Sequence, residues 1–224
     1  MTELRESPMS AEATVNDMLD RLAIRELADN WLIYRDNRDW EKFFEVWHDD
    51  VVILTTWGGR TTAREFAAAA EAGYQRGDRM LHAAGGISVE LAGNRAIGQS
   101  KMRIMQRGPV HGVMCDATCI GRNYDFYEKR DGRWGLVLRQ PIYECDFLVT
   151  VDSSETVKLD PEILARRPNG YARLAYLQEG FGYPIKPDMP TAEGPELEAL
   201  LEQGRIWLAG GELTWALERA EASA

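Results

Sequence analysis

The sequence is poor in the residues that build disulfide frameworks and metal centres. Its 224 residues include three cysteines and three histidines. The cysteines stand at 115, 119 and 145, and no C-x-x-C motif with a histidine pair is present, so neither a disulfide scaffold nor a metal site is expected. A phosphate-binding loop and a dinucleotide-binding glycine motif are also missing. Chemistry without a metal or other cofactor is therefore the simplest expectation.

Long apolar runs and an excess of positive charge are lacking as well. No apolar run is long enough to cross a bilayer, and residues 1–13 contain no apolar signal-peptide core, so a cytoplasmic location is expected. The net charge of −10 and a pI near 4.9 argue against nucleic acid or an anionic membrane as a partner. What is present, a hydrophobic share of 45%, is enough for a packed core. The length of 224 residues fits one domain with an appendage, or two very small domains.

The first third of the chain predicts three helices around one strand. Residues 14–36 carry an apolar stripe of helical period. Asp39 is a good N-cap for a short second helix with aromatic residues at i, i+3, i+4 and i+7. A β-rich segment, 51–57, ends at a Gly-Gly turn, and a capping box, Thr62 to Glu65, opens a third helix. The aromatic residues of the second helix are Trp40, Phe43, Phe44 and Trp47.

From residue 80 the pattern changes to four long strands. Turn signals lie at Gly93-Asn94 and Asp131-Gly132, and Gly108-Pro109 predicts a looser connection in the middle. Helices followed by an antiparallel meander indicate an α+β fold, in which a curved antiparallel sheet forms a cone-like barrel with the three helices packed on it. The mouth of such a cone can hold a small ligand. The strands are predicted at 80–91, 95–107, 113–129 and 134–149.

The composition shifts after Val149, so we divide the chain into a cone domain, 14–149, and a helical C-terminal extension, 150–224. Short helices are predicted after Asp160 and at 169–180. A longer helix is predicted at 195–221, interrupted at Gly210-Gly211. About seventy residues are few for an independent domain. We expect the extension to pack on the cone, cover its mouth or contact a neighbouring subunit.

Four stretches carry a family resemblance: Asp36-Asn-Arg-Asp-Trp40, Leu81-His-Ala-Ala-Gly-Gly86, Asn123 to Trp134, and Leu138-Arg139. With the order of elements, they resemble the nuclear-transport-factor-type, SnoaL-like cone-fold family. That family includes scytalone dehydratases, dehydrochlorinases, diarylpropane lyases, ketosteroid isomerases and polyketide cyclases. The resemblance implies that Asp36 and His82 form a catalytic Asp–His dyad, with Arg139 and Asn123 in the same pocket. It departs at Gln106, where scytalone dehydratases have their main catalytic histidine.

An aspartate held against one imidazole nitrogen fixes the tautomer and raises the basicity of the other nitrogen. Arg139 and Asn123 would hold a substrate oxygen or a developing oxyanion. Each residue also has a plain structural alternative. Asp36 could be an exposed elbow charge, His82 a core histidine, Arg139 an outward salt bridge, and Asn123 an edge asparagine.

Further residues are candidates for the pocket wall, although aromatic residues on a helix face more often belong to the core. Gln106 would point inward in the register that puts Lys101 and Arg103 outside, and a slip of one residue would reverse this. His48 is expected at a solvated helix end and His111 in a loop. The wall candidates are Trp31, Tyr34, Arg35, Thr55, Gln106 and Tyr143.

These residues predict a cofactor-independent lyase that removes water or a small fragment, such as formaldehyde, from a small, hydrophobic, aromatic hydroxylated substrate. An isomerase or polyketide-type cyclase of the same fold is the nearest alternative. A structural small subunit of a ring-hydroxylating dioxygenase and a passive ligand binder are the alternatives without catalysis. The family resemblance also implies a homodimer or homotrimer.

Overall fold

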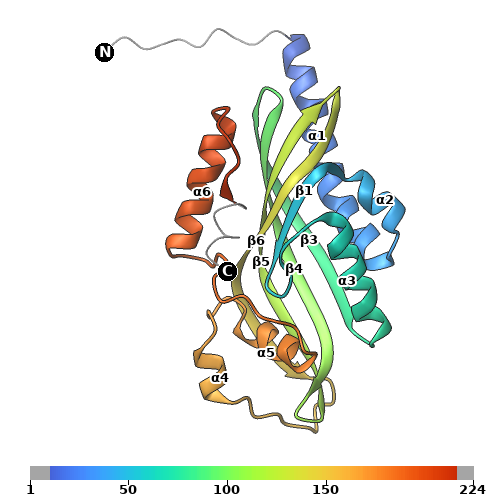
Figure 1. Cartoon of the computed structure of the whole chain (residues 1–224), viewed down its shortest axis with the longest axis vertical. Coiled ribbons are helices and arrows are strands. Elements are labelled where there is room, and N and C mark those ends of the chain that lie inside the picture. The colour runs from blue at the N-terminus through green and yellow to red at the C-terminus, as the bar shows by residue number, and fades with distance from the viewer. Residues whose placement is uncertain (1–10, 216–224) are drawn as a thin grey trace.

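The computed structural model describes residues 11–215, and its elements follow the predicted order (Figure 1). No described helix is both long and apolar enough to span a membrane. The helices are α1 (Ala11–Asn37), α2 (Trp40–Glu45), α3 (Ala63–Gln75), α4 (Pro161–Ala165), α5 (Ala172–Gly180) and α6 (Pro195–Leu208). The strands are β1 (Trp47–Thr55), β2 (Gly59–Thr61), β3 (Arg79–Ala92), β4 (Arg95–Val110), β5 (Val113–Arg130) and β6 (Arg133–Thr150).

In the described part of the chain the strands form a six-stranded sheet with the order β2-β1-β6-β5-β4-β3. The meander from β3 to β6 is antiparallel, as predicted, and the α+β fold class is confirmed. The sheet curves but stays open, with β2 and β3 at its edges (Figure 1). The prediction of a wholly antiparallel sheet is wrong for β1, which runs parallel to β6. No tight turn joins these two strands, so nothing local in the sequence records their relative direction.

The middle connection of the meander also differs from the prediction. Gly108 and Pro109 lie inside β4, and the chain turns at His111 and Gly112. Their φ angles are +52° and +86°. A two-residue hairpin turn with two positive φ values matches the twist of the flanking strands, which explains why β4 and β5 stay paired to their ends.

The elbow after α1 is a tight helix end. Arg38 has φ +59°, and its N–H donates to the Arg35 carbonyl at 3.2 Å. The N–H of Asp39 donates to the Tyr34 carbonyl at 2.8 Å, which satisfies a second carbonyl of the last turn. This end fixes the direction in which Asp36 leaves α1.

The second helix is shorter than its aromatic spacing predicts. Asp39 precedes it but makes no side-chain cap, because its carboxylate binds Lys42 at 2.7 Å. Trp47 begins β1 instead of closing the helix. Its ring still packs on Phe43 at 5.9 Å, so the aromatic cluster forms from both elements. The capping box of α3, between Thr62 and Glu65, is present as predicted.

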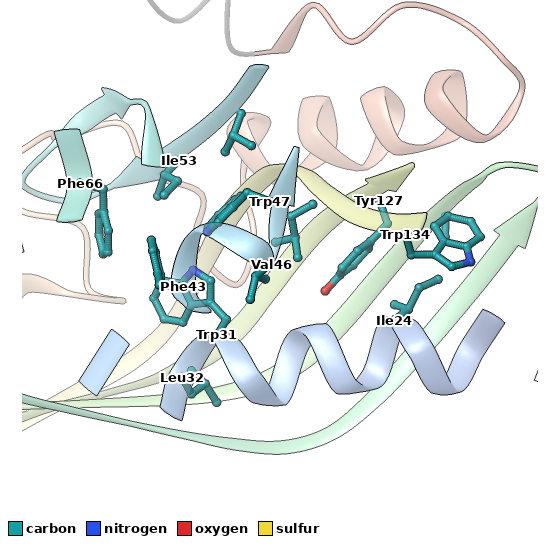
Figure 2. Close-up of a cluster of buried hydrophobic side chains, with 13 residues drawn as sticks. Ile24, Trp31, Leu32, Phe43, Val46, Trp47, Ile53, Phe66, Tyr127 and Trp134 are labelled. Carbon is teal, nitrogen blue, oxygen red and sulfur yellow. The ribbon is translucent and has the colours of Figure 1, made fainter. Parts of the chain in front are cut away.

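The sheet has an inner face and an outer face, and side chains alternate between them. On β5, Cys119, Asn123 and Tyr127 point to the inner face, where α1, α3 and α5 pack. Tyr124 and Phe126 point outward and pack with residues of α6. Figure 1 shows α6 on the opposite side of the sheet from α1. Figure 2 shows one hydrophobic cluster of the inner face, with Trp31, Phe43 and Trp47 between α1 and the sheet.

The C-terminal extension therefore wraps both faces of the sheet. Helix α5 adds Leu174 and Leu177 to the inner core, and α6 covers part of the outer face with Leu200 and Trp207. Helix α6 ends at Leu208, just before the predicted break at Gly210, and the last part of the predicted helix lies outside the described residues.

Candidate active site

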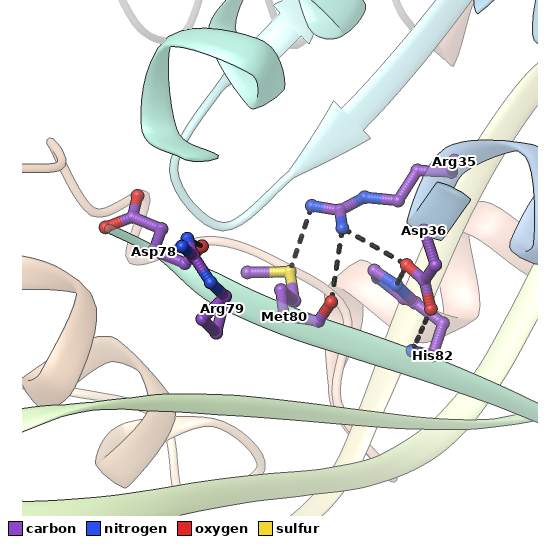
Figure 3. A network of polar contacts seen from close by, with 6 residues as sticks. All are labelled: Arg35, Asp36, Asp78, Arg79, Met80 and His82. Carbon is purple, nitrogen blue, oxygen red and sulfur yellow. Dashed lines mark hydrogen bonds and ion pairs between the residues drawn. The ribbon is translucent and has the colours of Figure 1, made fainter. Parts of the chain in front are cut away.

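The last turn of α1 and strand β3 bring Asp36 and His82 into direct contact (Figure 3). Asp36 Oδ1 lies 2.7 Å from His82 Nδ1, and Asp36 Oδ2 accepts the backbone N–H of His82 at 2.7 Å. Both side chains are largely buried, with 15% and 6% of their surfaces exposed. The two hydrogen bonds fix the position of the histidine as well as its ring, so its Nδ1 carries the proton and Nε2 is the ring nitrogen available to a substrate.

The charges around the pair keep the carboxylate ionised and the imidazole neutral. Burial works against ionisation of Asp36, but the hydrogen bonds and charge of His82, with the charge of Arg35, lower its pKa. Burial and the positive charges of Arg35 and Arg139 lower the pKa of His82, although Asp36 acts in the opposite direction. A neutral imidazole at neutral pH can accept a proton.

Arg35 lies beside the pair and crosses toward β3. Its Nη1 is 3.1 Å from Asp36 Oδ1, and its Nη2 is 3.5 Å from the sulfur of Met80. The side chain is 12% exposed. A guanidinium in this position neutralises the charge of Asp36 and forms part of the cavity wall in front of His82 (Figure 3).

Arg139 is fully buried and held by Asp125, a residue that sequence analysis missed. Arg139 Nε and Nη2 donate to the two carboxylate oxygens of Asp125 at 2.9 and 2.6 Å. Although burial disfavours its charge, the carboxylate of Asp125 raises the pKa of Arg139. Its guanidinium carbon also lies 4.3 Å from the centre of the Trp31 ring. Asp125 is two residues from Asn123 and so shares its face, which was the signal available in the sequence.

These residues line a small cavity of about 40 Å³ on the inner face of the sheet. Trp31, Arg35, Thr55, His82, Asn123, Arg139 and Tyr143 all line it, as sequence analysis predicted. Asn123 donates to Ser100 Oγ at 3.4 Å and is 4% exposed. Burial raises the pKa of Tyr143, so its hydroxyl stays protonated. Apolar parts of the wall come from Ile53, Leu54, Phe66, Met102 and Ile104.

Three lining side chains carry a buried N–H with no hydrogen-bond partner in the described structure. They are Trp31 Nε1, Arg35 Nε and Arg139 Nη1. Buried polar groups are nearly always paired, because an unpaired donor costs about 1–3 kcal/mol. All three of these atoms are donors, so the cavity suits a ligand that offers acceptor oxygens.

Gln106 points inward, as predicted, but it does not line the cavity. Gln178, from α5, stands in front of it and is part of the wall. Gln178 Nε2 donates to Gln106 Oε1 at 3.1 Å, and Thr56 Oγ1 donates to Gln178 Oε1 at 2.9 Å. The C-terminal extension thus supplies one polar wall, which its sequence does not reveal.

Two predictions about neighbouring residues are wrong, and a third is confirmed. Tyr34 packs beside the cluster of Figure 2 with the Lys42 ammonium 5.7 Å from its ring, so it does not line the cavity. His48 is not at a solvated helix end, because it is 6% exposed in β1 and its Nε2 lies 2.9 Å from the Glu128 carbonyl. His111 lies in the β4–β5 turn, as predicted, with Nε2 2.6 Å from the Tyr176 hydroxyl.

The donor set of the cavity contains one histidine and no cysteine. Within residues 11–215, no group of three or more His, Cys, Asp or Glu side chains is placed to hold a metal ion. The chemistry that this arrangement offers is proton transfer at His82 next to several N–H donors.

Comparison with known proteins places the chain in a family. The model of the SnoaL-like domain matches residues 16–140. Pea pathogenicity protein 2 of Fusarium vanettenii is 37% identical over 205 residues, which cover 87% of this chain and 88% of that protein. The chain belongs to the SnoaL-like family.

Solved structures confirm the fold predicted for this SnoaL-like protein. A hexachlorocyclohexane dehydrochlorinase (LinA) of type 2 superposes with a TM-score of 0.53 at 19% identity, covering 67% of this chain and 99% of that one. A scytalone dehydratase-like protein from Novosphingobium aromaticivorans gives 0.51 at 16% identity, covering 65% and 93%. At these identities the likeness shows a shared fold. About two thirds of this chain matches almost the whole of both structures. The fungal relative matches 87% of this chain, so its match extends well beyond residue 140 and includes part of the C-terminal extension.

Proposed function

We propose that this SnoaL-like protein is a cofactor-independent lyase that eliminates water or a small fragment from a hydrophobic, hydroxylated aromatic compound. The observation that carries the proposal is the contact between Asp36 and His82 at a cavity whose unpaired polar atoms are all N–H donors. The structural similarity to a dehydrochlorinase and a scytalone dehydratase-like protein supports elimination, because both proteins share the fold of this chain.

In the proposed reaction, His82 Nε2 removes a proton from a carbon next to a carbonyl group. The imidazolium that forms is stabilised by the carboxylate of Asp36, which is already ionised. The same imidazolium returns the proton to the departing oxygen, so that water leaves and a carbon–carbon double bond forms. No proton is gained or lost overall.

The charge that develops on the carbonyl oxygen needs donors that are in place before the reaction. Arg139 is fixed by Asp125 and still has Nη1 unpaired, and Arg35 Nε is unpaired beside it in the wall. Asn123 adds an amide on the same side of the sheet. Donors held rigidly in a dry site stabilise an oxyanion more than mobile water does, and each contributes about 3–4 kcal/mol of barrier reduction in well-studied enzymes.

The same dyad would also serve an isomerase or a cyclase, which moves a proton within one molecule. The Asp–His pair and the unpaired donors at the cavity favour either catalytic reading over a structural small subunit or a passive binder. Neither non-catalytic role needs a buried Asp–His pair with unpaired donors around it, because leaving such groups unpaired reduces the stability of the fold.

A β-hydroxy aryl ketone tests the reaction class directly. We expect the protein to convert 3-hydroxy-1-tetralone to 1-naphthol, with a product mass lower by one water. His82→Asn should reduce the rate by about 10²–10⁴-fold, the usual contribution of a general base. The matched control is His111→Asn, since His111 lies in the distant β4–β5 turn. A product of unchanged mass would favour an isomerase, and unchanged turnover in His82→Asn would rule out the dyad.

A further inference from the structure

A second and larger cavity lies next to the candidate active site. Its volume is about 220 Å³, against about 40 Å³ for the inner cavity. Arg35, Trp57 and Met80 line both, so the two cavities share a wall. The dyad spans this wall, because Asp36 lines the outer cavity and His82 the inner one. Figure 3 shows Arg35 reaching across to Met80, the contact that joins two residues of the shared wall.

The outer cavity is lined by aromatic rings from four separate segments. They are Trp40 of α2, Trp57 after β1, Tyr74 of α3, and Tyr183 after α5. Ala70 of α3 also lines it and leaves space between the rings. Flat rings around an open volume match the shape and chemistry of an aromatic ligand.

Each ring is held in place by a polar or aromatic partner. Trp40 Nε1 donates to Glu71 at 3.2 Å, and the Tyr74 ring has the guanidinium carbon of Arg38 at 3.7 Å from its centre. The Tyr183 hydroxyl binds Asp78, and its ring lies 5.3 Å from that of Trp57. Walls that are fixed before binding lose little conformational freedom when a ligand arrives.

Among the described residues, two side chains that line this cavity carry an unsatisfied polar atom: Arg35, through its donor Nε, and Asp78. Asp78 lines it with a side chain that is 8% exposed, and Asp78 Oδ1 has no hydrogen-bond partner in the described structure. A buried carboxylate oxygen of this kind is an acceptor for a ligand hydroxyl. The unpaired atoms of the inner cavity are donors only, so the outer cavity differs in offering an unpaired acceptor as well.

We propose that the outer cavity is a binding site for a second aromatic ring of the substrate, whose reacting end enters the inner cavity. This assignment rests on the proposed function, since it takes the inner cavity as the place of reaction. A volume of about 40 Å³ is far too small for two rings, so the second ring of such a substrate has to lie elsewhere. The outer cavity is adjacent and several times larger, and its wall combines four aromatic rings with charged side chains.

Phenol and 4-hydroxybiphenyl, which differ by one ring, test the proposal by isothermal titration calorimetry. We expect 4-hydroxybiphenyl to bind the full-length protein about ten- to a hundredfold more tightly, the gain from burying one more ring. Ala70→Phe fills the outer cavity and should remove most of this advantage while the affinity for phenol stays the same. Ala68→Phe is the matched control, because Ala68 is an exposed residue of the same helix.

Equal affinity of the wild type for both compounds would overturn the proposal, as would an equal loss of both affinities in Ala70→Phe. Ala70→Leu provides a second, smaller filling variant, and thermal unfolding checks that each variant folds. Binding does not depend on turnover, so a failure here leaves the Asp–His proposal standing. If the protein shows no lyase activity but still binds 4-hydroxybiphenyl more tightly than phenol, the binding site in the outer cavity is supported and the proposed function is not.

Discussion

Two arginine–aspartate pairs on neighbouring strands have the same geometry and different burial, which allows a matched prediction. Arg139 donates to Asp125 through Nε and Nη2 at 2.9 and 2.6 Å, and Arg107 donates to Asp116 through the same atoms at 2.7 Å each. The side chains of the first pair are 2% and 1% exposed, whereas those of the second are 47% and 17% exposed. We compare Asp125→Asn with Asp116→Asn.

The buried pair should matter far more. Removing the charge of Asp125 leaves the guanidinium of Arg139 unpaired in the core, which costs about 3–5 kcal/mol of unfolding free energy. For a chain of this size that lowers the melting temperature by about 6–20 °C. The Tyr127 hydroxyl, 3.2 Å from Asp125 Oδ2, also loses a charged acceptor. In the Arg107 pair, solvent screens the charges, so Asp116→Asn should change stability little.

Urea unfolding followed by circular dichroism measures both variants, and an unchanged slope shows that the same surface is exposed on unfolding. Replacing both partners, Asp125→Leu with Arg139→Met, should recover much of the loss because no charge is left unpaired. Equal losses for Asp125→Asn and Asp116→Asn would refute the argument, since burial would then not decide the strength of the pair.

Three further predictions concern the site and its surroundings. Because the pKa of His82 is lowered from 6.5, kcat/KM should fall only at pH values below 6.5. The free energy of unfolding should also decrease there, since the histidine of the unfolded chain binds a proton at a higher pH than that of the folded chain. A pH series of turnover and of urea unfolding checks both. Asp36→Asn should lower kcat by about 10²-fold or more with a smaller change in KM, and an unchanged kcat in steady-state kinetics would contradict its role in orienting His82. Gly73→Ala places a methyl group 2.7 Å from Asp78 Oδ2 and against the Tyr183 hydroxyl, so urea unfolding should show a free energy of unfolding lower by about 1–3 kcal/mol. Gly86→Ala is the control, because a methyl group there meets nothing within 4 Å.

Local sequence patterns determined the element order, because each element has its own period or end signal. The capping box at Thr62 and Glu65 placed α3, and the alternating strands placed the meander with Gln106 inside. Patterns failed where tertiary contacts overrule local preference. Trp47 continues a helical spacing, yet it lies in β1, because the strand pairs with β6 and the ring still reaches Phe43.

The sequence by itself determined which residue types were available for chemistry, and the family resemblance put Asp36 and His82 forward. Only the tertiary structure decided their contact, because the two residues lie 46 positions apart and no local rule sets the distance between a helix end and an edge strand. It also decided that Arg139 is bound by Asp125, and that Gln178 of the C-terminal extension closes one wall of the cavity. Hydrophobic patterning records which face of an element is buried, but not which buried polar groups meet there. That choice depends on the packing of all the layers together.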